Sequence, residues 1–430
     1  MNNKVKDIIK CIYYSKGGKL LRTFPEKWTF ERKRKELQKN LHIINNKRKS
    51  YPIKIVFIVE YPEIWNSSKT IFESLSKRKN VEAYILAMPQ YPNLLNNEAY
   101  DFFSNMYLNV FKGYDTTEDK WFELEKLNPD YVFYTRPYDK EYPDVFKPKM
   151  VSKYAKLCYV PYGYEFVRGY HVEVEYNLKT FPYLYMVFNE GETSYDYCVR
   201  LCDKGFSDKH IFKIGYPRFD LLYSLKKQQE KNQKDIKTVL WTPRWSIEKL
   251  ANDGTSYFEF IDPLLNYFSL HKDIELVIRP HPLMFKNFIK MGVMTNEEVD
   301  KIHQCVEEMK NVYFDSNKDY LQSVYNSDFI ISDYTSMLLE YIILDKPVLY
   351  CGQSKNFDNV GNKLNSAMYQ LNDYKNIIDA IDHIRSYGDT ISLKRREIIE
   401  ELTNGFDGKS GERIVTEIIN DYEVAFGEFV

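Results

Sequence analysis

Four residues that can bind phosphate or a nucleotide follow the apolar run Phe329–Ser332. Asp333, Thr335 and Ser336 follow this predicted strand at once, and an amphipathic helical pattern begins at the same point. Free backbone N–H groups at the start of a helix attract anions, and the hydroxyl groups add hydrogen-bond donors. Glu340, one helical turn later, can accept hydrogen bonds from ribose hydroxyls. An ordinary capping box is the structural alternative.

A second candidate site follows the predicted strand Ile274–Ile278, where Arg279 and His281 are each followed by a proline. A guanidinium binds phosphate oxygens in a bidentate manner, and an imidazole can stabilise or protonate a leaving phosphate. Pro280 and Pro282 stiffen the turn. We therefore expect both side chains to point from the strand end into a cleft, with a purely structural histidine as the alternative.

Two further turns carry cations. Pro243 and Arg244 follow the predicted strand Thr238–Trp241 in a tryptophan-rich turn, which can hold a nucleotide or simply be a buried aromatic turn. Lys409 and Arg413 lie in a segment with two glycines, which is typical of a phosphate-binding nest, although a helix cap also explains it. The strand, spacing and ending of a P-loop are absent there.

In the first half of the chain, Tyr162 and Glu165 follow the predicted strand Leu157–Val160. Gly163 permits a tight turn between them, which can present either side chain to a cleft. Turn geometry alone is the alternative explanation.

Short apolar runs alternate with amphipathic helical patterns from Pro52 onward. Near-continuous apolar strands that alternate with helices indicate parallel sheets covered on both faces. The predicted strands are Ile53–Val59, Val81–Met88, Tyr131–Tyr134, Leu157–Val160, Leu184–Phe188, Ile211–Ile214, Thr238–Trp241, Ile274–Arg279, Val312–Phe314, Phe329–Ser332 and Val348–Tyr350. Helices are predicted near Lys69–Leu75, Phe258–Leu270, Glu297–Met309, Ser336–Leu344 and Tyr374–Ile384.

A polar stretch at 226–237 interrupts this alternation and is interpreted as a linker. The chain is accordingly divided into a basic N-terminal segment (1–50), a first Rossmann-like domain (51–225), the linker (226–237) and a second Rossmann-like domain (238–430). Two doubly wound α/β domains that face each other across a cleft are the predicted fold. Ligands bind such sheets at the carboxyl ends of the strands.

The charge distribution separates the N-terminus from the rest. Residues 1–50 hold fifteen Lys or Arg against four Asp or Glu, a net charge of +11, which leaves −12 for residues 51–430. Apolar residues at helical spacing, from Ile8 to Leu21, accompany these cations and favour an interfacial helix on an anionic membrane. A helix packed on its own domain is the alternative, and no motif points to nucleic acid.

Composition excludes several classes of protein. With 44% hydrophobic and 28% charged residues, the chain is neither collagen-like nor wholly disordered. No apolar run approaches the ~18 residues of a membrane helix, and the N-terminus shows no secretory signal. Six cysteines in 430 residues do not suggest a disulfide framework, so a cytoplasmic setting is expected. No spacing of Cys or His predicts a metal site, and no cofactor is expected.

Taken in order, these pieces resemble the CDP-glycerol glycerophosphotransferase family of teichoic-acid and capsule polymerases. The resemblance spans roughly residues 50–420 and rests on the Gly215–Asp220 turn, Pro243, Arg279–Pro282, Ser332–Ser336 with Glu340, Lys346–Pro347, and Asp407–Lys409 with Arg413. It implies a GT-B fold with an acceptor domain first and a CDP-alditol-binding domain second. It also implies peripheral attachment to the inner face of the cell membrane, which agrees with the basic N-terminus.

The resemblance further implies a reaction and a set of roles. A hydroxyl of a lipid-linked or glycan acceptor would attack the donor's β-phosphate, and CMP would leave. His281 would stabilise or protonate the leaving side. The other implied donor-site residues are Arg279, Thr335, Ser336, Lys409 and Arg413 around the pyrophosphate, and Pro243, Arg244, Asp333 and Glu340 around the nucleotide, with Glu340 where the family usually has an Asp.

The expected general base departs from the family. The family commonly has a histidine just before the glycine of the first-domain turn, and Tyr162 occupies that position here. A tyrosine with an ordinary pKa near 10 is a poor base at neutral pH, so Glu165, or another acid such as Glu60, is expected to serve. Two other functions remain open: a GT-B glycosyltransferase that uses a nucleotide sugar, and a catalytically idle scaffold subunit of a polymer-assembly complex.

Overall fold

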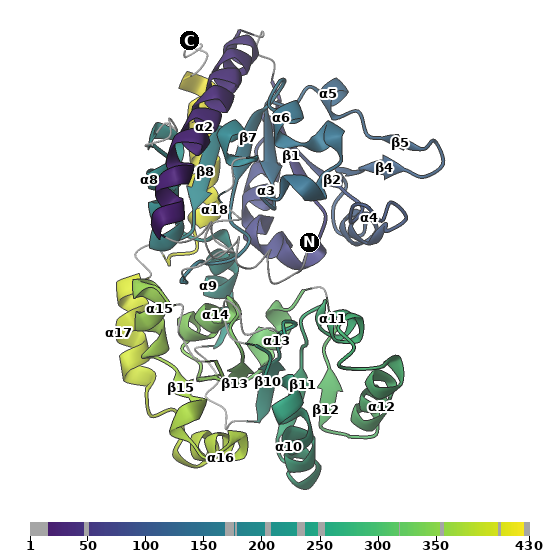
Figure 1. Cartoon of the computed structure of the whole chain (residues 1–430), viewed down its shortest axis with the longest axis vertical. Helices are drawn as coiled ribbons and strands as arrows, with labels where there is room; N and C mark the ends of the chain where they lie inside the picture. Colours follow the sequence, from purple (N-terminus) through teal and green to yellow (C-terminus); the bar gives the residue numbers. More distant parts are fainter. Residues whose placement is uncertain are drawn as a thin grey trace.

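The protein forms two α/β domains stacked along its long axis (Figure 1). This computed structural model describes residues 16–46, 51–167, 176, 179–202, 208–229, 237–247, 254–317, 319–352, 357–402 and 406–424. Residues 1–15 of the predicted membrane segment lie outside the described residues, as do residues 230–236 of the predicted linker.

The first domain is built on a seven-stranded parallel sheet in the order β3-β2-β1-β6-β7-β8-β9. Its central strands are apolar on both faces because helices cover both sides. The strands are β1 (Ile53–Val59), β2 (Val81–Ala87), β3 (Val110–Lys112), β6 (Tyr131–Tyr134), β7 (Lys156–Tyr159), β8 (Met186–Asn189) and β9 (Ile211–Lys213), and a separate hairpin pairs β4 (Tyr114–Asp115) with β5 (Lys120–Trp121).

The second domain is built on a six-stranded parallel sheet in the order β12-β11-β10-β13-β14-β15. Its strands are β10 (Thr238–Thr242), β11 (Glu275–Ile278), β12 (Val312–Phe314), β13 (Phe329–Ser332), β14 (Val348–Tyr350) and β15 (Tyr369–Gln370). The predicted doubly wound fold is confirmed, and the strands predicted over Ile53–Val59 and Phe329–Ser332 match β1 and β13 residue for residue.

In both sheets the strand order reverses once, between β1 and β6 in the first domain and between β10 and β13 in the second. The connections on either side of such a switch point leave in opposite directions, which opens a crevice at the carboxyl ends of the two strands. The two switch points are therefore the places where the topology favours a ligand.

Helices surround both sheets. The α-helices are α2 (Lys16–Asn45), α3 (Lys69–Ser76), α4 (Glu98–Ser104), α5 (Leu124–Leu127), α6 (Pro148–Val151), α8 (Glu192–Cys202), α9 (Pro217–Gln229), α10 (Tyr257–Leu270), α11 (Met284–Lys290), α12 (Asn296–Glu307), α13 (Leu321–Asn326), α14 (Met337–Ile343), α15 (Asn359–Asn365), α16 (Ile377–Tyr387), α17 (Ser392–Leu402) and α18 (Ser410–Val424). Short 3-10 turns are η1 (Pro62–Ser67), η2 (Asp139–Glu141), η3 (Asp144–Phe146), η4 (Phe181–Tyr183), η5 (Asp208–His210) and η6 (Leu371–Asp373).

Helix α18, the last described helix, packs on the first domain, although the sequence placed residues 238–430 in the second. Its apolar face, with Ile414 and Ile418, joins the core formed by β1 and by Ile71 and Leu75 of α3. Figure 1 shows this yellow helix beside the sheet of the upper domain. The C-terminal segment thus crosses back and ties the two domains together.

Helix α2 lies along the first domain rather than apart from it (Figure 1). Phe30, Leu37 and Ile44, seven residues apart, are buried, which is the spacing that keeps one face of a helix on its support. Arg34, only 5% exposed, donates to the carbonyl oxygens of Leu184 at 2.6 Å and Pro182 at 3.3 Å. Among the described helices, none is both long and apolar enough to span a bilayer.

Candidate functional site

Asp333 joins the two loops that leave the switch point of the second sheet. Its buried carboxylate, 2% exposed, accepts hydrogen bonds from the backbone N–H of Arg244 at 2.8 Å and of Ser256 at 3.1 Å. Burial raises the pKa of Asp333, while these N–H donors oppose the rise. The residue that we predicted at the nucleotide therefore shapes the loop after β10 in this structure.

Arg244 contacts Tyr334, a residue that lies between the two domains. Its Nη1 donates to the carbonyl oxygen of Tyr334 at 3.0 Å, and its guanidinium lies 5.3 Å from the centre of the Tyr334 ring. Phe166 of the first domain packs on the same ring at 5.4 Å between centroids. Burial raises the pKa of the Tyr334 phenol, and the charge of Glu165 raises it further. The predicted Glu165 and Arg244 are thus gathered around one tyrosine between the domains.

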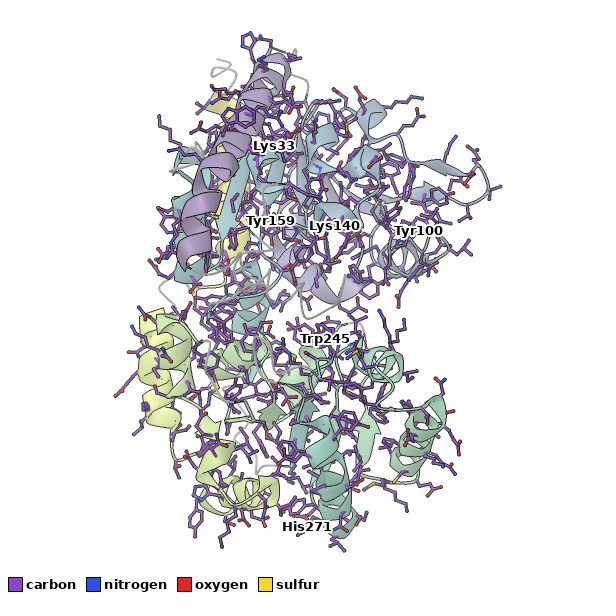
Figure 2. The ribbon with its side chains drawn as sticks, viewed as in Figure 1. Lys33, Tyr100, Lys140, Tyr159, Trp245 and His271 are labelled. Atoms are coloured by element: carbon purple, nitrogen blue, oxygen red, sulfur yellow. The ribbon has the colours of Figure 1, made fainter. Side chains whose placement is uncertain are left out.

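His281 lies beside this group, at the carboxyl end of β11. Its ring stands 6.0 Å from the ring of Trp245, which Figure 2 labels at the edge of the second domain that faces the first. The imidazole is exposed at the protein surface, but the surrounding protein removes enough water to lower its pKa to about 4, and the Arg244 cation contributes. His281 is therefore neutral at neutral pH.

The hydrogen bonds of His281 identify its tautomer. The backbone N–H of Leu283 donates to Nδ1 at 3.1 Å, so Nδ1 carries a lone pair. A neutral imidazole has one proton, which then resides on Nε2. The ring can offer an N–H donor to a phosphate oxygen, but it has no ionisable proton to give up at neutral pH.

Thr335 and Ser336 begin α14 at the same corner. The Thr335 hydroxyl accepts a 3.4 Å hydrogen bond from the Met337 N–H, whereas the Ser336 hydroxyl makes no capping bond to its helix. The capping-box alternative is therefore not realised, because Glu340 accepts from Arg218 and Tyr320 instead. Thr335 and Ser336 are half-buried.

The Arg279 guanidinium, which we predicted at the donor phosphates, is bonded to protein groups in this structure. Its Nη1 donates to Asp315 at 2.6 Å, its Nη2 donates to the carbonyl oxygen of Asn317 at 2.8 Å, and its guanidinium lies 5.6 Å from the Tyr320 ring. Asp315 had no role in the sequence argument. Asp315 follows β12, and Arg279 follows the neighbouring strand β11. The ion pair is therefore formed by residues at two adjacent carboxyl ends of the sheet.

Glu340 lies inside the protein and not at a ligand surface. Its Oε1 accepts from Arg218 at 2.9 Å and from the Tyr320 hydroxyl at 2.8 Å, and its side chain is 1% exposed. Arg218 also donates to the carbonyl oxygen of Tyr162 at 2.9 Å. The residue that we predicted near the ribose therefore belongs to a buried ion pair between the domains.

Tyr162 and Glu165, the two predicted first-domain residues, contact different groups. The Tyr162 hydroxyl is 2.9 Å from the Tyr138 hydroxyl, and its carbonyl oxygen accepts from Tyr216 and Arg218. Glu165 lies nearer to the second domain, at Tyr334. Of the two predicted first-domain residues, Glu165 is the one whose side chain acts across to the second domain.

An ion pair lies at the switch point of the first sheet, and only one of its members, Glu60, was named from the sequence. Glu60 follows β1 and Arg136 follows β6, with Nη1 and Oε2 3.7 Å apart. Burial raises the pKa of Glu60 to about 8. Arg136 lies between the rings of Tyr61 and Tyr138, at 4.6 and 4.9 Å. Its place directly behind the strand Tyr131–Tyr134 was the signal that could have identified it.

Lys409 and Arg413 stand at the start of α18, beside Gly215. The N–H groups that open this helix are already used, because Asp220 accepts from Ser410 at 2.9 Å and from Gly411 at 2.8 Å. Arg413 pairs with Asp407 at 2.6 Å. Asp220, far away in sequence, therefore caps this helix, as the helix-cap alternative predicts. The phosphate contacts of Lys409 and Arg413 stay predictions.

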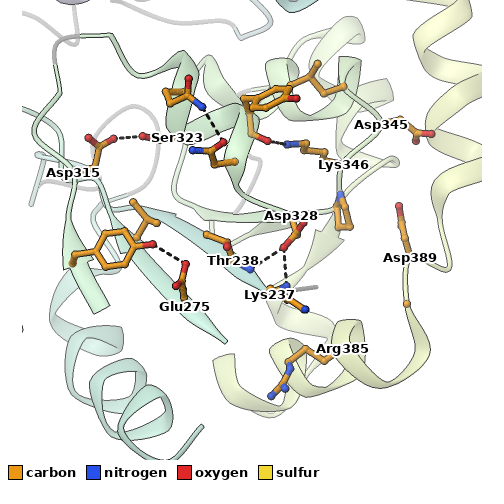
Figure 3. A pocket seen from close by; sticks show the side chains of 18 of the residues that line it. Lys237, Thr238, Glu275, Asp315, Ser323, Asp328, Asp345, Lys346, Arg385 and Asp389 are labelled. Carbon is orange, nitrogen blue, oxygen red and sulfur yellow. Dashed lines mark hydrogen bonds between the residues drawn. The ribbon is translucent and has the colours of Figure 1, made fainter. Parts of the chain in front are cut away.

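A cavity of about 1810 Å³ extends along the second sheet from its amino edge to Asp315, which follows β12 (Figure 3). Thr238 and Glu275, the first residues of β10 and β11, line it, and Asp328 accepts there from the N–H of Lys237 and Thr238 at 2.7 and 2.8 Å. Ligands of such sheets bind at the carboxyl edge, and the residues gathered around Asp333 do not line this cavity, so it is not the candidate site. Within the described ranges, no cluster of three His, Cys, Asp or Glu is suited to a metal ion.

Comparison with known proteins adds a family to this geometry. The sequence profile described as CDP-Glycerol:Poly(glycerophosphate) glycerophosphotransferase matches residues 203–420. The teichoic acid poly(glycerol phosphate) polymerase of Staphylococcus epidermidis is 27% identical over 153 residues, which are 33% of this chain and 19% of that polymerase. The chain thus aligns with well under two thirds of that relative.

Solved structures share the fold. The wall teichoic acid polymerase TagF matches with a TM-score of 0.55 and 16% identity, over 91% of this chain and 97% of that chain. UDP-GlcNAc 2-epimerase from Neisseria meningitidis, bound to UDP-GlcNAc, matches with a TM-score of 0.53 and 16% identity, over 86% of this chain and 100% of that chain. The predicted GT-B-like fold is confirmed by these neighbours.

Proposed function

We propose that this chain, which belongs to the CDP-Glycerol:Poly(glycerophosphate) glycerophosphotransferase family, moves glycerol phosphate from CDP-glycerol to a hydroxyl of a polymer or lipid-linked acceptor and releases CMP. Membership in the family confirms the resemblance seen in the sequence and supports the transfer of glycerol phosphate. The activity, its donor, its acceptor and the release of CMP are the proposed part.

One observation carries the proposal: the motif residues converge at the switch point of the second sheet. Asp333 ties together the loops that follow β10 and β13, and Arg244, Tyr334 and His281 stand next to one another there. The family match includes all of these residues. A diphosphate beside Arg244 and His281, with Ser336 and Thr335 as hydroxyl donors, is the arrangement that this chemistry supports.

In the proposed reaction the acceptor oxygen bonds to the β-phosphorus, while the bond from that phosphorus to the bridging oxygen breaks. The bridging oxygen leaves with CMP, and the proton of the acceptor hydroxyl passes to Glu165. The Nε2–H of neutral His281 and the Arg244 cation stabilise the charge that develops on the phosphates. Glu165 is preferred to Tyr162 because its charge acts on Tyr334 of the second domain.

Cytidine diphosphate compounds are expected to stabilise the purified protein against thermal unfolding. A ligand at about 100 times its dissociation constant adds about 2.7 kcal/mol to the folded state. CDP-glycerol and CDP should raise the unfolding temperature, and Ser336→Ala should weaken donor affinity by roughly 2–10-fold through one lost hydrogen bond. Differential scanning fluorimetry over a ligand series measures both.

The matched control is Ser269→Ala, which removes an exposed hydroxyl that bonds only locally, to the carbonyl oxygen of Asn266. Its donor affinity should equal that of the wild-type protein. Stabilisation by a UDP-sugar and not by CDP-glycerol would replace the proposal with a nucleotide-sugar glycosyltransferase. A protein that no nucleotide stabilises would be a scaffold subunit.

We also propose peripheral attachment to an anionic membrane through the basic residues 1–50, at the cytoplasmic face. Each lysine near an anionic surface contributes about 1 kcal/mol. Replacing Lys4, Lys6 and Lys10 with alanine should therefore weaken co-sedimentation with anionic vesicles by about 3 kcal/mol at low salt, with little effect at high salt. Vesicle binding that neither salt nor this variant changes would contradict the proposal.

A further inference from the structure

A groove beside helix α2 gathers positive charge. Its cavity measures about 690 Å³, and seven of its lining side chains are basic against two that are acidic. We name it the basic groove; its cations are Arg32, Lys33, Lys35 and Lys39 on α2, with Lys147, Lys149 and Lys179 opposite, and Glu36, Asp139 and Tyr183 complete the lining.

The cations of the basic groove are only partly balanced by the acids beside them. Lys147 pairs with the exposed Asp144 at 2.6 Å, and Lys149 approaches Glu36 at 3.9 Å. Such exposed pairs are worth little. Burial lowers the pKa of Lys33, and the cations Arg32, Lys149 and Lys179 lower it further, against the opposing effect of Asp139. An anion in the groove would relieve this repulsion, because it would stabilise the charged form of Lys33.

The turn η2 links the groove to the switch point of the first sheet. A neighbouring cavity of about 610 Å³ shares Asp139, Lys147 and Lys179 with it. Asp139 begins η2, and Glu141 at the end of η2 is bonded to Arg136 at the switch point of the first sheet. Lys140 of the same turn lies closer to the second domain than Lys33 does (Figure 2).

We propose that the basic groove binds the phosphodiester chain of a polyanionic acceptor and directs its terminal hydroxyl toward the cleft. This inference rests on the proposed function and adds the place on this chain where the charged acceptor binds. A chain with one negative charge per repeat matches a row of lysines on two facing walls. A planar bilayer does not match this arrangement, because a bilayer contacts flat or convex surfaces. The lysines of α2 and α6 instead face one another across a concave groove.

The test compares two charge-matched double variants. Lys149→Glu/Lys179→Glu reverses two exposed lysines of the basic groove that lie opposite α2 and outside residues 1–50. Lys126→Glu/Lys301→Glu makes the same change in charge at side chains that are 74% and 68% exposed and lie outside the groove. The probe is a soluble glycerol-phosphate oligomer of defined length, with neutral dextran as the uncharged comparison.

The oligomer should bind the wild-type protein with an affinity that falls steeply as salt rises from about 50 to about 200 mM. The groove variant should bind it roughly tenfold or more weakly, and the matched variant within about twofold of the wild type. In turnover, the groove variant should raise the acceptor KM and leave the KM for CDP-glycerol unchanged. Binding to anionic vesicles should be the same in both variants.

Equal oligomer binding by the two variants, or no binding by the wild type, would overturn the inference. So would a groove variant that loses vesicle binding alone, because the groove would then be a membrane surface. Failure of the proposed function has a different signature. In that case CDP-glycerol neither stabilises the protein nor turns over, whatever the oligomer does.

Discussion

Replacing His281 with alanine should lower kcat by about 10²–10³-fold, the usual cost of removing one hydrogen-bond donor from a developing anion. The Nδ1 atom of His281 is occupied by the Leu283 N–H, which leaves Nε2–H as the group that reaches a phosphate oxygen. This contact strengthens as charge develops, so the KM for CDP-glycerol should change far less. Steady-state kinetics of CMP release measure both constants.

The pH dependence separates this role from acid catalysis. The pKa of His281 is lowered to about 4, so the neutral ring persists throughout pH 5–8, and kcat should show no limb near 6.5 that belongs to His281. His281→Asn, which retains an N–H donor, should keep more activity than His281→Ala. The control His271→Ala alters a histidine stacked on Tyr267 at the far end of α10 and should leave kcat unchanged.

Wild-type kcat in a folded His281→Ala protein would remove His281 from the reaction. A limb near pH 6.5 that vanishes in the variant would instead identify His281 as a general acid, in conflict with its depressed pKa.

Arg218→Ala should destabilise the protein by about 3–5 kcal/mol, because it leaves the Glu340 carboxylate buried without its cation. The side chains of Arg218 and Glu340 are 5% and 1% exposed, and they meet at 2.9 Å. The change also removes the donor to the Tyr162 carbonyl, and so loosens the contact between the domains. Urea unfolding, followed by tryptophan fluorescence, measures the effect.

The double variant Arg218→Met/Glu340→Met tests the cause. If the cost is an uncompensated buried charge, removing both groups should restore most of the lost stability. Lys126→Ala breaks an ion pair between side chains that are 74% and 57% exposed and should change stability by less than about 1 kcal/mol. A double variant less stable than Arg218→Ala would show that packing, and not charge, is responsible.

The central strands were predictable because buried parallel strands are apolar on both faces, and this pattern is local. Ile53–Val59 and Phe329–Ser332 therefore match the structure at both ends. The edge strands β3 and β15 were missed, whereas the edge strands β9 and β12 were predicted. The residues of β3, Val110–Lys112, are only half-buried, so they lack the pattern of a buried strand.

Much of the candidate site was predictable for a related reason. The carboxyl ends of parallel strands meet at one edge, so polar residues directly behind predicted strands, such as Arg244, Asp333 and His281, had to come close together. The same rule would have added Arg136, which follows Tyr131–Tyr134. Arg136 was not predicted because no motif surrounds it.

The amino-acid sequence by itself determined the two parallel sheets, the family, and which strand ends carry the polar residues, since periodicity and residue order are local properties. Only the tertiary structure decided which charges meet. It placed Glu340 against Arg218 instead of a ribose, set Asp220 at the start of α18, and returned α18 to the first domain. A buried charge takes whichever partner the packed chain brings within a few ångströms, and sequence separation carries no information about that distance.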